Sequence, residues 1–273
     1  MIAAEQHLRM SNFASSLVVK SRPERPLTGE LFDMAKVLIW DWPTRIIHWL
    51  LTLGFLACFG IAQLAGEHSA WFPIHMVLGV SLGFVVLLRV MWGFMGTRYA
   101  RFSSFLYSPS ALFAYLKGTL SGKAPRFAGH NPGSAYATFA LLLLIGVVVV
   151  TGLLMSSGSE AAEEMHVPAA YALAAAVAIH IVGVFWHTWR HRENLTLTMV
   201  TGWKEAPPVA RIASTRPAVA ALFAVVVAAV TLGLFRNYDS AKRQTTVPFA
   251  GTVIRLGEVE GGESDGRRSR DGD

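Results

Sequence analysis

Long apolar stretches alternate with short polar segments along this chain. Each stretch holds about twenty residues, which is the length that an α-helix needs to cross roughly 30 Å of hydrocarbon. Within a stretch the apolar residues are continuous and do not alternate with polar ones, which favours helices over the strands of a membrane barrel. We therefore predict transmembrane helices at Ile46–Leu64, Trp71–Met95, Tyr136–Met155, Val167–Trp189 and Ala218–Phe235.

The remaining segments suggest how the chain is organised. The sequence Ser108-Pro109-Ser110 resembles a helix start, so we expect a helix over Tyr107–Leu120 that lies along the membrane interface. The end of the chain is rich in Gly, Asp, Glu and Arg, a composition typical of disorder. We expect a disordered N-terminal extension (1–36), a four-helix domain (37–204), a fifth helix (205–236) and a disordered tail (237–273).

Composition and charge support a membrane protein. The chain is 53% hydrophobic and only 15% charged, which is too apolar for a soluble domain of 273 residues. Its net charge of +6 would suggest nucleic acid as a partner of a soluble protein. Here the basic residues gather in segments 96–134 and 190–216, while the links 65–70 and 156–166 carry acids only. The positive-inside rule therefore predicts a cytoplasmic N-terminus and a lipid environment, with no nucleic-acid partner.

Histidines are the ionisable residues that stand out within the predicted helices. Ionisable side chains are costly inside a membrane, so each is a functional candidate. The single cysteine, Cys58, lies in the middle of the first predicted helix and is interpreted as a packing residue. One cysteine excludes the Cys-x-x-Cys-His motif of covalent haem attachment. The candidate histidines are His48, His75, His166, His180 and His187.

The spacing of these histidines predicts two metal sites at different depths. His166 and His180 are fourteen residues apart on one helix, so they lie about 21 Å apart along its axis and within about 40° of the same face. In the predicted topology His75 matches His166 in depth, near the outer surface, and His48 matches His180, in the cytoplasmic half. We call these the outer pair and the inner pair. Pairs of imidazoles in a helical bundle typically hold haem b, so we predict two haems.

His187 is the alternative to His180, because it lies seven residues further along and points in nearly the same direction. Its distance from His166 is about 31 Å, the full hydrocarbon thickness, so we prefer His180. Small residues beside the ligands would leave room for a flat macrocycle, although they also let membrane helices approach each other closely. They are Gly79, Ala169, Ala170, Ala176 and Gly183.

Two arginines lie toward the cytoplasmic side of the predicted helices. Arg45 precedes His48, and Arg89 comes late in the second helix. Either side chain could contact a haem propionate there. Extension of the guanidinium to lipid phosphates explains both positions equally well.

The residues around these histidines resemble the bacterial cytochrome b561 and Ni-Fe hydrogenase b-type cytochrome superfamily. The likeness covers roughly residues 37–204 and joins several motifs in order. One departure is His166-Val167-Pro168, where the family usually has His-Glu, so we expect the outer site to be the less secure one. The matching segments are 40–49, 74–79 leading to Leu88-Arg89, 178–180 and 186–195.

The resemblance implies a fold, a cofactor and partners. The fold would be an all-α integral membrane protein, a four-helix haem-binding bundle with a fifth C-terminal helix, in the bacterial inner membrane. The haem ligands would be His48, His75, His166 and His180. The function would be one-electron relay between the quinone pool and a cytochrome or oxidoreductase partner, with possible quinone or quinol oxidoreductase activity.

Two other functions use the same sequence features. A histidine-based proton or metal transporter would place histidines in the membrane, but the predicted helices lack the buried Asp or Glu that such pathways usually add. A b-type membrane anchor subunit of a peripheral oxidoreductase is compatible with the cytochrome interpretation.

Overall fold

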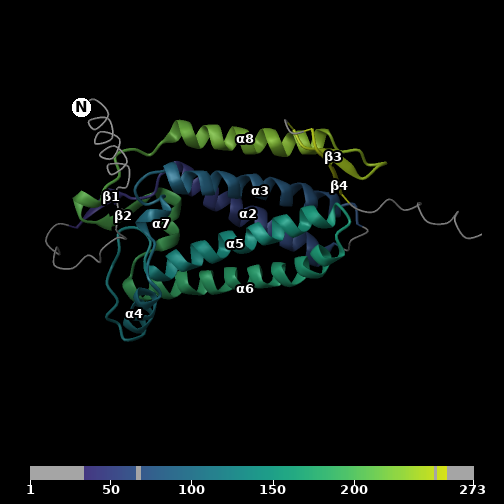
Figure 1. Cartoon of the computed structure of the whole chain (residues 1–273). Coiled ribbons are helices and arrows are strands. Elements are labelled where there is room, and N and C mark those ends of the chain that lie inside the picture. Colours follow the sequence, from purple (N-terminus) through teal and green to yellow (C-terminus); the bar gives the residue numbers. More distant parts are fainter. Residues whose placement is uncertain (1–33, 66–68, 249–250, 257–273) are drawn as a thin grey trace, which may run out of the picture.

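The computed structural model describes residues 34–65, 69–248 and 251–256. Its described part is mostly helical, with two small antiparallel sheets at opposite ends of a helical bundle (Figure 1). Five helices in this part are long and apolar enough to cross a membrane, which confirms the predicted spans. They are α2 (Trp42–Leu64), α3 (Phe72–Met95), α5 (Pro132–Met155), α6 (Glu160–His191) and α8 (Pro217–Arg236).

Capping residues set where these helices begin. The Asp41 carboxylate accepts a hydrogen bond from the backbone N–H of Thr44 at 2.8 Å, and Asn131 does the same at the start of α5. Helix α6 begins at Glu160, seven residues before the predicted start at Val167, so that boundary was wrong. The physical reason is that Ser159 caps the helix, and acidic residues in its first turn are stabilised there although they are not hydrophobic.

The transmembrane helices pack as two pairs with the fifth helix on one side. Helix α2 packs along α3, α5 packs along α6, and α3 joins the pairs through α5. Helix α8 packs on α2 and α3, on the side away from α6 (Figure 1). Among the described residues, α6 lies close along α5 but not along α2 or α3. Helices α2 and α3, which carry His48 and His75, are therefore set apart from α6, which carries His166 and His180.

Apolar packing and one hydrogen bond attach α8 to the bundle. Phe223 and Val227 of α8 are buried against Ile47 of α2 and Val85 of α3. Further along the same helix, the Thr231 hydroxyl donates to the Ser81 hydroxyl of α3 at 2.9 Å. The remaining faces of the bundle expose many large apolar side chains, as expected for surfaces that face lipid.

The basic segments fold into a cap at one end of the bundle, which we call the basic end (Figure 1). Strand β1 pairs antiparallel with β2, which follows more than 160 residues later, with Ala35 opposite Ala206 and Leu38 opposite Trp203. The helix expected over Tyr107–Leu120 is present as α4 and is capped by Ser108. The elements of this end are β1 (Ala35–Leu38), η1 (Phe102–Ser104), α4 (Pro109–Leu120), α7 (Leu195–Thr201), β2 (Trp203–Ala206) and η2 (Pro208–Ala210).

A hairpin covers the other end, which we call the hairpin end. Strands β3 (Gln244–Thr246) and β4 (Val253–Arg255) pair antiparallel within the segment 237–273 that the sequence predicted as disordered. That prediction is corrected for the hairpin, because Ile254 and Leu256 are buried against α3 and α8. Short strands with few apolar residues give little sequence signal, so the hairpin was missed. Residues 257–273, and 1–33 of the predicted extension, lie outside the described residues.

Candidate functional site

The outer pair of histidines meets between α3 and α6 toward the hairpin end. The ring centroids of His75 and His166 are 6.4 Å apart, and their planes are inclined by 79°. A metal bound by one nitrogen of each imidazole at about 2 Å separates the ring centres by roughly 6 Å. The spacing of this pair therefore fits an iron atom held between the rings.

Hydrogen bonds fix the tautomer of both rings in the outer pair. Nδ1 of His75 lies 2.9 Å from the backbone carbonyl oxygen of Cys58, which can only accept, so Nδ1 carries the proton. Nδ1 of His166 lies 3.0 Å from Oγ1 of Thr151, whose own proton is donated to the carbonyl of Val147. Each imidazole therefore keeps an unprotonated Nε2, the form that binds a metal, with its other nitrogen held by a neighbouring oxygen.

Neighbouring residues also hold the orientation of these rings. Phe72 stacks on His75 with centroids 5.5 Å apart. Helix α5 lies against the ring of His166 on α6. A Cβ atom added to Gly152 of α5 would come within 3.2 Å of Cε1 of His166, so the glycine allows this close approach. The sequence suggested that the outer pair is the less secure site, because Val167 follows His166 where the family usually has Glu. In the structure the Thr151 hydroxyl of α5 supplies a hydrogen-bond partner to His166.

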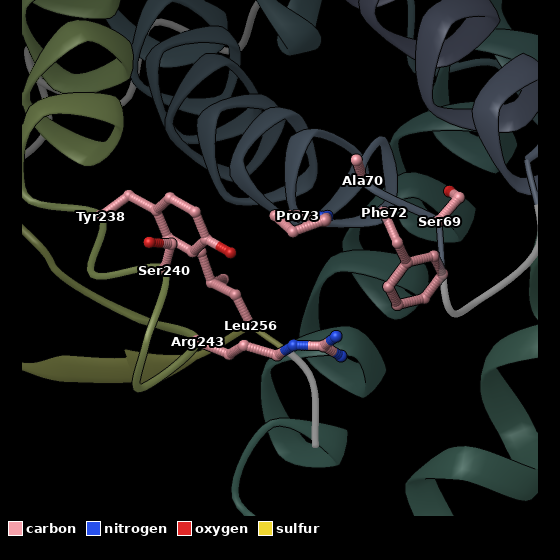
Figure 2. A pocket seen from close by; sticks show the side chains of 8 residues that line it. All are labelled: Ser69, Ala70, Phe72, Pro73, Tyr238, Ser240, Arg243 and Leu256. Carbon is pink, nitrogen blue, oxygen red and sulfur yellow. The ribbon is translucent and has the colours of Figure 1, made fainter. Parts of the chain in front are cut away.

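A pocket of about 380 Å³ lies beside the outer pair at the hairpin end. Figure 2 shows Phe72 and Pro73, at the start of α3, facing Tyr238 and Arg243 of the hairpin segment across it. Because Phe72 stacks on His75, this pocket is one aromatic ring away from the outer pair.

The inner pair lies toward the basic end, and its two rings are not in direct contact. His48 and His180 are close enough to interact electrostatically, although their rings make no direct contact that matches that of the outer pair. Nδ1 of His48 is buried and has no hydrogen-bond partner among the described residues. A buried nitrogen without a partner is destabilising. Ligation of a metal by His48 would satisfy such an imidazole, so this residue also fits the expected cofactor.

Open space lies beside two of the candidate histidines. A Cβ atom added to Gly79, one turn after His75, would meet no atom within 4 Å, and the same holds for Gly183, three residues after His180. Helix α6 is also set apart from α2 and α3. Together these features leave room for a flat group at each pair.

His187 is engaged by other side chains. Its Nδ1 lies 3.3 Å from the Tyr115 hydroxyl and its Nε2 lies 3.3 Å from Glu193, which also pairs with Lys204 at 3.1 Å. Both ring nitrogens therefore have protein partners, which favours His180 over His187 as the ligand. Burial would raise the pKa of Glu193, but the bonds with His187 and Lys204 outweigh it and lower that pKa.

The Arg45 side chain is bound to the C-terminal end of α7. Its guanidinium donates hydrogen bonds to the backbone carbonyls of Met199, at 3.3 Å, and Val200, and it lies over the ring of Trp42 at 3.9 Å. These contacts tie α2 to the C-terminus of α7, where a positive charge is favourable. They give Arg45 a structural role, which competes with the predicted propionate contact.

Arg89 has fewer partners than Arg45. It is buried, donates to the carbonyl of Ala100 at 3.3 Å and lies over the ring of Phe102 at 4.8 Å. The nearby Asp41 carboxylate interacts with it electrostatically. That carboxylate accepts hydrogen bonds from the backbone N–H of Thr44, the indole N–H of Trp92 and the hydroxyl of Thr97. Arg89 forms no ion pair within the described part of the chain.

His130 also lies near the inner pair, and sequence reasoning missed it. Its ring stacks on Phe105 with centroids 4.2 Å apart and meets Trp40 edge-on at 4.9 Å. Burial and, to a smaller extent, the charges of Arg89 and Lys204 lower the pKa of His130 to about 3, so the ring is neutral. The residue precedes α5 in a loop and carries no helical pattern, so only its position in the fold distinguishes it.

Comparison with known proteins agrees with this geometry. The sequence pattern of the prokaryotic cytochrome b561 family matches residues 39–202. This range includes all four histidines of the outer and inner pairs and ends before α8. No solved structure has significant similarity to the chain.

Two similar proteins carry hydrogenase names. The "Probable Ni/Fe-hydrogenase B-type cytochrome subunit" of Bradyrhizobium diazoefficiens is 23% identical over 214 residues, which cover 62% of this chain and 86% of that protein. The "Probable Ni/Fe-hydrogenase 1 B-type cytochrome subunit" of Escherichia coli is 25% identical over 142 residues, which cover 44% of this chain and 60% of that protein.

Proposed function

Because this chain belongs to the prokaryotic cytochrome b561 family, we propose that it is a dihaem b-type cytochrome that relays electrons across the bacterial inner membrane. The observation that carries the proposal is the outer pair. His75 and His166 lie at a separation that fits a metal between them, with each Nδ1 held and each Nε2 free to bind. The inner pair, His48 and His180, would hold the second haem.

The chain itself does three things in this proposal. It holds the ligands at two depths, because His166 and His180 are about 21 Å apart along α6. It orients the rings through the Cys58 carbonyl and the Thr151 hydroxyl. It keeps bulk water away with a bundle of apolar helices. When bound, haem b supplies a reversible one-electron couple whose potential depends on the ligands and their hydrogen bonds.

The partners in this proposal are the quinone pool and a redox protein. Support for an oxidoreductase partner comes from the names of the two relatives, so a role as the membrane anchor of a peripheral oxidoreductase is included. The pocket beside Phe72 supports quinone access at the hairpin end, since apolar walls meet Tyr238 and Arg243 there. The basic segments support a cytoplasmic N-terminus, with the hairpin end outside.

The transporter alternative has less support. In the described membrane helices the acidic residues lie only in the first two turns of α6, at Glu160, Glu163 and Glu164. Within the described residues, no group of three or more His, Cys, Asp or Glu side chains is arranged to hold a metal ion. A proton or metal pathway would need such groups along its length.

Substitution of the ligands one at a time tests the pairing. Haem content and the optical spectrum would be measured on purified protein carrying His75→Ala, His166→Ala or both changes. We expect all three variants to keep one haem with the same spectrum and midpoint potential, because either change removes the same site. Loss of both haems on a single change, or different remaining haems in the two single variants, would contradict the pairing.

His187→Ala serves as the control for this series. Its nitrogens bind Tyr115 and Glu193, so the variant should keep two haems. Loss of a haem in His187→Ala, together with its retention in His180→Ala, would exchange the two residues in the inner pair.

A further inference from the structure

Two polar side chains at the basic end are buried with fewer polar partners than their chemistry allows, although Arg89 donates one hydrogen bond to the carbonyl of Ala100. Arg89 is only 5% exposed, and its guanidinium forms no ion pair with the described residues. Nδ1 of His130 is buried and has no hydrogen-bond partner in the same part of the chain. Native proteins rarely leave such groups unsatisfied, so a missing hydrogen-bond acceptor at this place is the simplest explanation.

Aromatic rings join these two side chains into one cluster. Arg89 lies over Phe102 at 4.8 Å, Phe102 meets Phe105 edge-on at 6.0 Å, and Phe105 stacks on His130 at 4.2 Å. Trp40 holds the other side of the imidazole at 4.9 Å. The rings restrict His130, so its unpartnered nitrogen has a fixed position in the protein.

The cluster lies within electrostatic range of the inner pair. His130 is close enough to both His48 and His180 to interact with them electrostatically, and its strongest charged neighbour is Arg89. The other cation near it, Lys204, is already neutralised by Glu193 at 3.1 Å. Arg89, in contrast, has no carboxylate within ion-pair distance among the described residues, and Asp41 interacts with it only at longer range.

We propose that Arg89 and His130 together bind a propionate of the inner haem. This assignment rests on the proposed dihaem function and names residues that hold the carboxylate group of that haem. A carboxylate accepts hydrogen bonds at both oxygens, so it satisfies a guanidinium and an imidazole N–H at once. Arg45, the other predicted candidate, is bound to the backbone of α7 and is not part of this contact.

The state of His130 suits this role. Burial keeps the ring neutral, because it lowers the pKa of His130 to about 3. A neutral imidazole with its proton on Nδ1 donates one hydrogen bond from the nitrogen that lacks a partner. Arg89 supplies the charge, and His130 supplies a second donor in a fixed direction.

Redox titration of the purified holoprotein tests the assignment. His130→Phe keeps an aromatic ring between Phe105 and Trp40 but removes the donor. A propionate that loses this donor is less neutralised and favours the oxidised haem. We therefore expect two bound haems. The equilibrium constant for reduction of one haem should fall about tenfold, which lowers its midpoint potential by about 59 mV for one electron. The midpoint potential of the other haem should stay unchanged.

Conservative variants separate the hydrogen bond from the packing. His130→Gln offers an amide N–H and should restore at least half of the shift. Arg89→Gln should lower the same midpoint potential, and Arg89→Lys, which keeps the charge, should lower it less. His191→Phe is the matched control, because its Nε2 is also buried without a partner but its ring lies against His187, at 4.4 Å. This control should leave both potentials unchanged.

Three results would overturn the assignment. Unchanged potentials in His130→Phe and Arg89→Gln, with two haems bound, would show that neither side chain contacts a propionate. Loss of one haem in His130→Phe and also in His130→Gln would make His130 a ligand. A wild-type protein with fewer than two haems would refute the proposed function, and this assignment with it, so the two failures are distinguishable by the haem count.

Discussion

Thr151→Val is the perturbation that isolates the hydrogen bond to the outer pair. Valine has nearly the shape of threonine, and the side chain is buried, with 5% of its surface exposed. The change removes the oxygen that lies 3.0 Å from Nδ1 of His166 and leaves Nε2 of His166, the proposed iron-binding nitrogen, in place. The effect of the substitution therefore measures the contribution of the Thr151 hydroxyl, because His166 itself is unchanged.

The expected magnitude follows from the role of this oxygen. Loss of a hydrogen bond to a metal-binding histidine typically lowers metal affinity 10- to 100-fold, which corresponds to about 1.4–2.8 kcal/mol. An imidazole whose Nδ1–H has no acceptor is less basic, so it stabilises the oxidised iron less. The midpoint potential of the outer haem should rise, while that of the inner haem, held by other residues, should not change.

The assay measures haem retention and potential on the same samples. Purified Thr151→Val protein would be mixed with an excess of a haem-scavenging protein, and the loss of each haem followed by its absorbance. Thr138→Val is the matched control, because its hydroxyl on the same helix donates only to the carbonyl of Ser134, at 2.8 Å. Equal haem retention and equal potentials in Thr151→Val and wild type would refute the reasoning about the outer pair.

The remaining predictions concern the basic end. His187→Gln should keep two haems with unchanged spectra, because both of its nitrogens contact protein and not iron. Asp41→Ala should destabilise the protein by about 3 kcal/mol or more, seen as a lower melting temperature in detergent, since it removes the cap of α2 and leaves the indole N–H of Trp92 without its partner. Glu193→Gln should lower the melting temperature at neutral pH, because it removes the charge that pairs with Lys204. The folded-state pKa of Glu193 is below its ordinary value of 4.5. The stabilisation is therefore complete above about pH 4.5 and is lost as the pH falls through the folded-state pKa. A stability difference between wild type and Glu193→Gln that grows toward low pH would contradict this prediction.

The sequence predicts well what depends on hydrophobicity and helical period. The five spans follow from long apolar stretches, and the positions of His166 and His180 on α6 follow from 3.6 residues per turn. The start of α6 was missed because capping by Ser159 and the favourable acids of the first turn do not contribute to hydrophobicity. Local rules thus locate helix cores better than helix ends.

Contacts between distant segments could not be predicted from spacing. The carbonyl of Cys58 and the hydroxyl of Thr151 meet the outer pair from helices α2 and α5, and no local pattern records which backbone oxygen a ring will face. His130 has no periodicity to place it, because it lies in the loop before α5. The pairing of β1 with β2 joins the segments just before and just after the family-matching region, and it depends on the completed bundle.

The haem content of the wild-type protein tests the central claim most directly. Purified protein would be reduced with dithionite, and its haem quantified as the pyridine complex and divided by the protein concentration. The account predicts a b-type spectrum and two haems per chain, held by His75 with His166 and by His48 with His180. One haem per chain, or no b-type spectrum in a correctly folded preparation, would contradict it.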